Sequence, residues 1–362
     1  MIKYPSGITN NLLKPVIYGA ESNRASFTAG MNFNVTLKIL KSGNQVAAEG
    51  SFATALTFYS WVRKQVNARH PVSDYTSSRR NRKLMNEYTN RILVRVINHR
   101  VDLSHAPDNR WLEEFYPDNS NFLMSLPDFL GMNGARQWYE KGITYNVLGE
   151  TIHPFYGVYF PTRTEHLTLF SNWLSTRKED FGCAVDIGTG CGILSLLMAK
   201  CGIKDIYATD INPNAVYSTI METERHSFGS KIRAEQGSLF GSIKKFSGLT
   251  VFNPPWIPGE PNNLMDRGIY YEKGFFENFI RQADLRMQPE STLAIIFSNF
   301  AIEAGITDIN PIEEIAGMNK NFIIEDKLTH PVTERSPKGT KSWVNRIREN
   351  EVTELWILKK GG

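Results

Sequence analysis

The sequence predicts an α/β fold: a doubly wound, mostly parallel seven-stranded sheet, preceded by a mainly helical N-terminal domain. After Pro161, short apolar runs alternate with amphipathic helical segments, which is typical of parallel strands joined by helices. The last two runs are instead separated by a polar, turn-rich segment, which favours an antiparallel hairpin at one sheet edge. The seven expected strands are CAVDIG, IYATDI, IRAEQG, LTVFN, TLAIIFSN, NFIIEDKL and VTELWILK.

The first part of the chain follows another pattern and is expected to form its own domain. In SFATALTFYSWVRKQV, apolar residues recur at helical spacing after Ser51, a suitable N-cap. A second helix is expected over about 76–90, running into ILVRVI, with short helices in DNRWLEEF, NSNFLMSL and NGARQWYEKG. The alternating segment ITYNVLGETIHPFYGVYFP turns at Gly149 and predicts a β-hairpin. The expected parts are therefore a substrate-recognition domain over 1–140, a hairpin linker over 141–164 and a second domain over 165–362.

Composition places the chain among ordinary globular proteins. Of its 362 residues, 41% are hydrophobic and 22% are charged, which argues against disorder. No apolar run is long enough to cross a membrane, and the N-terminus lacks the apolar segment of a secretory signal. The three cysteines form no CxxC pair, so a reducing cytoplasm is expected. The seven histidines show no metal-binding spacing, so no metal site is expected.

Positive charge is concentrated in the first half of the chain. Residues 1–160 contain 18 Lys and Arg against 12 Asp and Glu, whereas the remaining residues contain 23 against 25. The segment from Arg63 to Arg100 alone has ten basic and two acidic side chains. Such a segment can attract an anionic partner such as RNA. The alternative is a set of solvated helix faces.

The segment VDIGTGCG ends the first expected parallel strand and opens a helix. Its glycines, Gly188, Gly190 and Gly192, allow a tight turn and close approach of the backbone to a ligand. Asp186 precedes them; it would repel a pyrophosphate but suits the cationic, amino-acid end of S-adenosylmethionine. The next strand ends in Asp210, where a carboxylate can accept hydrogen bonds from two ribose hydroxyls. NAD binding and a purely structural turn are the alternatives.

FNPPWIP, which follows the fourth of these strands, suits a nucleophile that is a planar, conjugated NH2 group. The lone pair of such a nitrogen is delocalised, and its two hydrogens need two fixed acceptors. The side-chain oxygen of Asn253 and the carbonyl of Pro254 can supply them, and Trp256 can stack on the planar group. In-line positioning of a sulfonium methyl then needs no strong general base. The alternative is a strand-ending turn with a core tryptophan.

Together these motifs resemble those of the class I S-adenosylmethionine-dependent methyltransferases, and most closely the protein-glutamine methyltransferases of release factors. The resemblance covers about residues 140–362 and includes the hairpin and a Pro161–Glu165 segment one residue shorter than the family's. Ser238 stands where that family tends to have an aspartate, and Trp256 replaces its tyrosine. The cofactor-binding residues that the resemblance implies are Thr164, Asp186, Gly188, Thr189, Gly190, Gly192, Asp210, Ile211, Ser238, Leu239 and Asn253.

The resemblance implies a Rossmann-like N-methyltransferase that uses S-adenosylmethionine and acts on a side-chain amide of a protein or peptide. An RNA methyltransferase acting on an exocyclic base amine is an alternative, supported by the basic region 63–100 and by Trp256. A degenerate domain that serves as a binding module is another, and small-molecule amines also stay open. The segment SPKGTKSWVNRIREN, with Lys338, Lys341, Arg346 and Arg348, is expected to be an exposed polar connector; contact with a substrate is the alternative.

Overall fold

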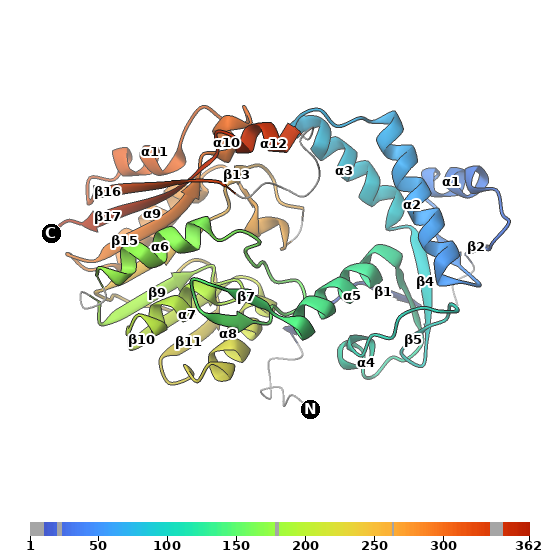
Figure 1. Ribbon diagram of the computed structural model, residues 1–362, viewed down its shortest axis with the longest axis horizontal. Helices are drawn as coiled ribbons and strands as arrows, with labels where there is room; N and C mark the ends of the chain where they lie inside the picture. The colour runs from blue at the N-terminus through green and yellow to red at the C-terminus, as the bar shows by residue number, and fades with distance from the viewer. Residues whose placement is uncertain (1–10, 20–23, 178–180, 263, 334–342) are drawn as a thin grey trace. The chain divides into compact units, whose positions relative to one another are not determined.

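The chain forms two compact units in a computed structural model that describes residues 11–19, 24–177, 181–262, 264–333 and 343–362 (Figure 1). The first unit covers residues 14–137, and the second covers residues 138–362 together with the chain up to Leu13. Leu13 N donates to Asn214 Oδ1 (2.7 Å), which ties this early segment to the second unit. The boundary at 137/138 lies three residues before the expected one at 140/141.

In the described part of the chain, the first unit contains five helices together with a six-stranded sheet. The strands run in the order β1-β6-β4-β3-β2, with β5 paired to β4. They are β1 (Ile17–Gly19), β2 (Ala25–Phe27), β3 (Val46–Ala48), β4 (Ile92–Ile97), β5 (Arg100–Val101) and β6 (Phe122–Ser125). The helices are α1 (Phe33–Lys41), α2 (Phe52–Arg69), α3 (Tyr75–Thr89), α4 (Trp111–Phe115) and α5 (Leu126–Lys141).

One segment expected to be helical is a strand: FLMS of the expected helix NSNFLMSL forms β6. The run ILVRVI, which follows the expected helix over about 76–90, forms β4. The two pair antiparallel, with Val94 opposite Met124, and every residue of β6 is buried. A short run that is buried on both faces has no alternation to distinguish a strand from a helix, so the sequence pattern was misleading here.

The sheet of the second unit has seven strands in the order β11-β10-β9-β12-β15-β17-β16. The four pairings from β11 to β15 are parallel, while β15–β17 and β17–β16 are antiparallel. The last two strands thus form the expected antiparallel pair at one edge. The strands are β9 (Cys183–Ile187), β10 (Asp205–Asp210), β11 (Ile232–Gln236), β12 (Leu249–Phe252), β15 (Thr292–Ser298), β16 (Phe322–Pro331) and β17 (Val352–Lys360).

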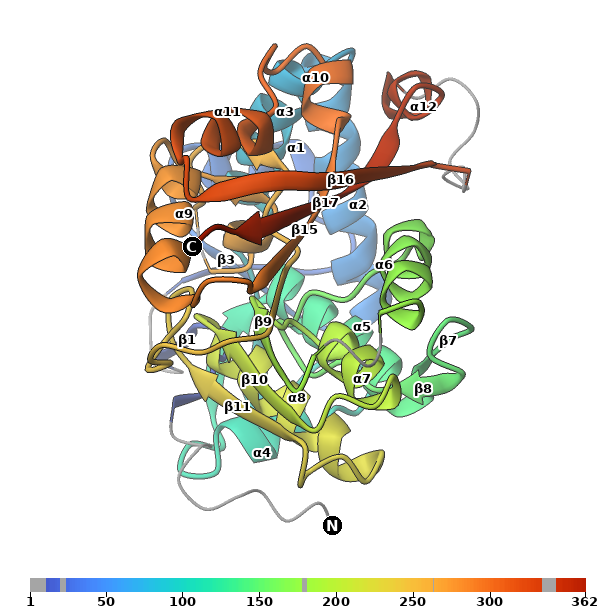
Figure 2. The same cartoon turned by 90° about the vertical axis from the view of Figure 1, so that its left-hand side faces the viewer.

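Helices cover both faces of this sheet. Figure 2 shows α6, α7 and α8 on one face and α9 and α11 on the other. A core of aromatic and aliphatic side chains, including Phe252, Phe279 and Trp356, packs on the α9 and α11 face. The helices of this unit are α6 (Glu165–Ser175), α7 (Ile193–Lys200), α8 (Pro213–Arg225), α9 (Phe275–Arg286), α10 (Phe300–Glu303), α11 (Pro311–Met318) and α12 (Trp343–Arg348), with a 3-10 turn at Asp266–Gly268.

Two short pairs of strands flank the main sheet. The hairpin β7 (Ile143–Tyr145) and β8 (Glu150–Ile152) turns at Gly149, as expected, but it ends well before residue 160. The parallel pair β13 (Ile257–Pro258) and β14 (Tyr270–Tyr271) follows the Asn-Pro-Pro-Trp segment and closes the loop after it.

Candidate active site

A cavity of about 840 Å³ lies within the second unit, at the carboxyl ends of β9, β10 and β12. Helices leave neighbouring parallel strands toward opposite faces here, which opens a crevice for ligands at this edge of the sheet. The structure brings together ten of the predicted residues as lining of this cavity: Gly188, Thr189, Gly190, Asp210, Ile211, Ser238, Leu239, Asn253, Pro254 and Trp256. It does not place Thr164, Asp186 or Gly192 among the lining residues.

The glycine loop forms one wall of the cavity through its backbone. Gly190 has φ +55°, and a Cβ atom there would lie 3.1 Å from the Tyr159 carbonyl oxygen. Gly192 has φ +83° and N-caps α7, where a Cβ atom would crowd Thr219. Left-handed backbone with neighbours this close strongly favours glycine, so the loop brings main-chain atoms against whatever occupies the cavity.

Asp186 lies beneath this loop instead of on the cavity surface. It is fully buried, and its Oδ2 accepts hydrogen bonds from Thr189 Oγ1 (2.9 Å), Ser195 N (3.0 Å) and Ser195 Oγ (2.6 Å). Burial raises the pKa of Asp186 to about 6, although the Ser195 and Thr189 hydrogen bonds lower it. Asp186 therefore holds the loop to the start of α7 through Oδ2, while its Oδ1 is buried without a hydrogen-bond partner among the described residues. Its contact with the cationic end of a cofactor stays a prediction.

Asp210 faces the cavity at the end of β10. Its Oδ2 accepts from Gly190 N (3.0 Å) and its Oδ1 from Asn212 N (2.8 Å). Burial raises the pKa of this carboxyl, and the backbone N–H groups of Asn212 and Gly190 lower it. A carboxylate oxygen has more than one lone pair, so each oxygen can still accept a ligand hydroxyl. The exposed Ile211 side chain follows it along the wall.

The end of β11 supplies the next part of the wall. Leu239 adopts φ +52°, and the hydroxyl of Thr209 donates to its carbonyl oxygen. Ser238 and Leu239 both line the cavity. This strand end therefore presents a hydroxyl and an apolar side chain where the resemblance implies contact with adenine.

The Asn-Pro-Pro-Trp segment forms the wall after β12. Trp256 Nε1 donates to Asn253 Oδ1 (3.1 Å), so the indole fixes the orientation of the amide. One lone pair of Oδ1 is used in this bond, and one is left for a ligand N–H. Trp256 is held in turn by His166, whose ring meets the indole edge to face at a centroid distance of 5.9 Å.

Several polar lining residues were missed by the sequence reasoning. His166 is 4% exposed, and burial lowers the pKa of its imidazole to about 4, so it is neutral at pH 7. Glu351 is also buried; its Oε1 accepts from Ser298 Oγ (2.9 Å), and its Oε2 lies 3.6 Å from Arg163 Nη1 and 3.5 Å from Arg348 Nη1. Arg348 is thus part of the cavity wall and not of an exposed connector, while the alternative of substrate contact by this segment, whose two lysines lie outside the described residues, stays a prediction. The three-residue spacing of Arg348 and Glu351 gives no helical signal, because α12 ends at Arg348.

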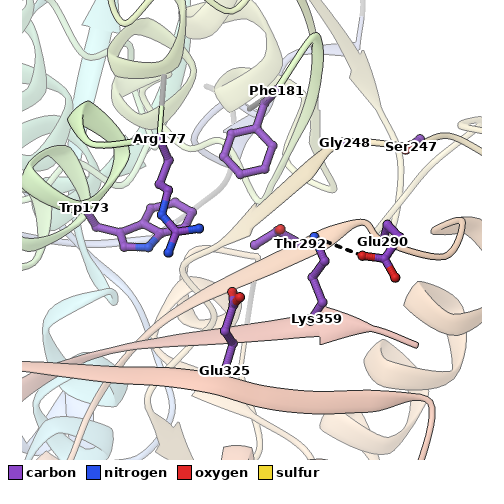
Figure 3. Close-up of a pocket in the computed structure, with 9 residues that line it drawn as sticks. All are labelled: Trp173, Arg177, Phe181, Ser247, Gly248, Glu290, Thr292, Glu325 and Lys359. Atoms are coloured by element: carbon purple, nitrogen blue, oxygen red, sulfur yellow. Dashed lines mark ion pairs between the residues drawn. The ribbon is translucent and has the colours of Figure 1, made fainter. Parts of the chain in front are cut away.

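The amino ends of β12 and β15 border a much smaller cavity, of about 140 Å³ (Figure 3). Gly248 and Thr292 line it at the amino ends of β12 and β15, beside the ion pair of Lys359 with Glu290 at 3.7 Å. In the described part of the chain, no group of three or more His, Cys, Asp or Glu side chains is arranged to hold a metal ion. No helix among these residues is long and apolar enough to span a bilayer.

Known proteins match part of this unit. A family model described as ribosomal protein L11 methyltransferase (PrmA) matches residues 157–242. The release factor glutamine methyltransferase of Aquifex aeolicus is 35% identical over 83 residues, which are 22% of this chain and 29% of the relative. The ribosomal protein L11 methyltransferase of Exiguobacterium sibiricum is 31% identical over 93 residues, or 26% and 28% of the two chains.

Two further matches extend the comparison. A Methanocaldococcus jannaschii protein named as a candidate protein N5-glutamine methyltransferase is 29% identical over 115 residues, 32% of this chain and 54% of its own. The chain thus spans about half or less of the length of these relatives. The crystal structure of a ribosomal protein L11 methylase from Lactobacillus delbrueckii subsp. bulgaricus is similar with a TM-score of 0.39 at 18% identity, covering 59% of this chain and 87% of that one.

The family match ends at residue 242, before Asn253. It covers the glycine loop, Asp210 and the end of β11, so it concerns the part of the cavity predicted to hold the cofactor. The predicted resemblance to the methyltransferases that use S-adenosylmethionine is confirmed.

Proposed function

We propose that this protein is an S-adenosylmethionine-dependent N-methyltransferase that acts on a planar side-chain amide of a protein or peptide. The observation that carries the proposal is the single cavity in which the glycine loop and Asp210 lie together with Asn253, Pro254 and Trp256. Asp210 would bind the ribose hydroxyls, and Ile211, Ser238 and Leu239 would enclose the adenine. The bound cofactor supplies a methyl group on a sulfonium.

The residues after β12 would then hold the acceptor. Its NH2 group would donate one hydrogen to the remaining lone pair of Asn253 Oδ1 and the other to the Pro254 carbonyl. The nitrogen lone pair forms the new N–C bond, and the electrons of the breaking C–S bond stay on sulfur, which becomes a thioether. The nitrogen then loses one proton to water. Positive charge develops on nitrogen during transfer, so fixed oxygen acceptors stabilise the transition state more than the bound substrate.

The choice of a protein amide rests on the release factor glutamine methyltransferase relative, whose name gives glutamine as the methylated residue; the L11 methyltransferase relatives likewise name a protein. A planar amide would lie against Trp256, which lines the same cavity as Asn253.

The experiment is transfer of tritiated methyl from S-adenosylmethionine to two sets of acceptors. One set is acetylated peptides with a single glutamine, asparagine or lysine, and the other is total cellular RNA. Label on glutamine or asparagine peptides, located at the side-chain nitrogen by mass spectrometry, is the expected result. Label on RNA alone, on lysine alone, or on neither set would contradict the proposal.

A further inference from the structure

The helix pair α2 and α3 of the first unit has many exposed basic side chains. Six of its basic side chains are exposed: Arg63, Lys64 and Arg69 on α2, and Arg80, Arg82 and Lys83 on α3. The helices pack against each other, and Asn81 Nδ2 of α3 donates to Asn67 Oδ1 (3.0 Å) and to the His70 carbonyl (2.7 Å). The two sets of charges therefore belong to one connected helical layer.

Almost no negative charge offsets this layer. Helix α2 contains no acidic residue, and α3 contains one, Glu87, which pairs with Arg91 at 3.4 Å. Asp74 lies between the helices, where its side chain accepts from Ser77 N (2.8 Å) as the N-cap of α3. The carboxylate of Asp74 therefore serves as the N-cap of α3. A solvated face selected only for solubility usually mixes both signs, as the rest of the chain does.

Aromatic side chains lie beside the arginines. The guanidinium of Arg63 lies over the Tyr59 ring, 5.4 Å from its centroid, and Arg79 Nη1 donates to Tyr75 Oη (3.4 Å). These contacts restrict the arginines before any partner binds. The same two helices also have exposed neutral side chains, among them Ser60, Asn67 and Asn86. Short hydroxyl and amide side chains of this kind contact phosphates alongside Arg and Lys.

We propose that the α2–α3 surface, defined by the six exposed basic residues above, binds the phosphate backbone of RNA. RNA is favoured over an acidic protein because its charges are regularly spaced and its unpaired bases can stack on arginine and tyrosine. The proposal concerns binding by the first unit and does not depend on which group the second unit methylates.

The test is binding of a fluorescein-labelled RNA stem-loop to the full-length protein, measured by anisotropy between about 50 and 200 mM salt. The affinity of the wild type should fall steeply with salt. The triple variant Arg80→Glu, Arg82→Glu, Lys83→Glu should bind at least about 30-fold more weakly at the lower salt concentration. The slope of its log affinity against log salt concentration should be smaller in magnitude by about 2 to 3, because each lost phosphate contact lowers that slope by about 1.

A matched control carries the same change in net charge on the other unit. Lys204, Lys244 and Lys245 are exposed, and the corresponding triple Glu variant should bind RNA within about 3-fold of the wild type. Equal weakening by the two triple variants would overturn the proposal, because it would show only a general effect of charge. Displacement of the RNA by polyglutamate at equal charge would overturn it in favour of an acidic protein partner.

Discussion

The amino ends and the carboxyl ends of the parallel strands β9, β10 and β12 lie in different surroundings, although they belong to the same strands. At the amino end of β10, Asp205 forms an ion pair with Arg233 at 3.0 Å, and both side chains are largely exposed. At the carboxyl end of the same strand, Asp210 is held by two backbone N–H groups inside a cavity of about 840 Å³. An exposed ion pair contributes little to stability, so Asp205 is a surface feature.

This difference shows where the fold keeps polar groups for a ligand. The carboxyl ends combine left-handed glycines, an oriented carboxylate and a rigid Asn-Pro-Pro turn, each of which costs conformational freedom or desolvation. The amino ends of β12 and β15 border a cavity of only about 140 Å³. Variants that affect the two ends of the strands differently therefore test this interpretation.

Asn253→Ala should have the largest effect. It removes the oxygen that we propose accepts a substrate N–H, and loss of one preorganised hydrogen-bonding group costs on the order of 10²–10³ in turnover. Affinity for S-adenosylhomocysteine should stay within about 2-fold, because the cofactor would be held mainly by other strand ends. Single-turnover transfer to the best peptide checks this. Asn172→Ala, on the exposed side of α6, is the control, and a similar loss in both variants would refute the role of Asn253.

His166 predicts a pH dependence of stability. Burial, offset by Glu165 and reinforced by Arg163, lowers the pKa of its imidazole to about 4, below the ordinary histidine value of 6.5. The unfolded chain therefore binds a proton between these two values while the folded chain does not, so stability should fall as pH decreases from 6.5 to 4. The total is on the order of 3 kcal/mol, from about 1.4 kcal/mol per pH unit.

Urea unfolding of His166→Leu across this pH range checks the assignment. The variant should lose most of this decrease in unfolding free energy, and His70→Leu at the exposed end of α2 is the matched control. An unchanged slope in His166→Leu would mean that other groups cause the pH dependence.

Trp256→Phe should have the smallest effect. Phenylalanine keeps an aromatic wall but lacks the indole N–H that donates to Asn253 Oδ1. A neutral hydrogen bond is worth about 1 kcal/mol, so turnover should fall about 5-fold. The loss should be in kcat with little change in KM, since the bond orients a group that acts in the transition state. A change in KM alone would assign Trp256 to substrate binding only.

Much of the second unit could be predicted from local sequence. The alternation of apolar runs and helices gave the strands, and glycine spacing, Asp210 and Asn-Pro-Pro-Trp marked three strand ends that do line one cavity. These signals are local because each depends on backbone geometry within a few residues. The surroundings of Asp186 could not be predicted in this way. The spacing of residues does not indicate whether a side chain points into the cavity or toward the helix that follows.

Other features depend on contacts between distant parts of the chain. Arg163 lies beside Glu351, and His166 contacts Trp256. The two residues of each pair are so far apart in sequence that no helix or strand periodicity relates them. In the first unit, β4 and β6 pair with each other, and burial of every residue of β6 removes the alternating pattern that would have indicated a strand there. A short apolar run in isolation fits a helix as well as a strand.

The most direct test of the account is calorimetric binding of S-adenosylhomocysteine to the wild type and to two variants of β10. Asp210→Asn replaces a carboxylate at the carboxyl end by an isosteric amide, and Asp205→Asn makes the same change at the amino end. We expect Asp210→Asn to bind on the order of 10- to 100-fold more weakly, because two charge-assisted hydrogen bonds to the ribose are weakened or lost. Asp205→Asn should bind as the wild type does. Equal affinities for all three proteins, or weaker binding by Asp205→Asn alone, would contradict the placement of the cofactor at the carboxyl ends of these strands.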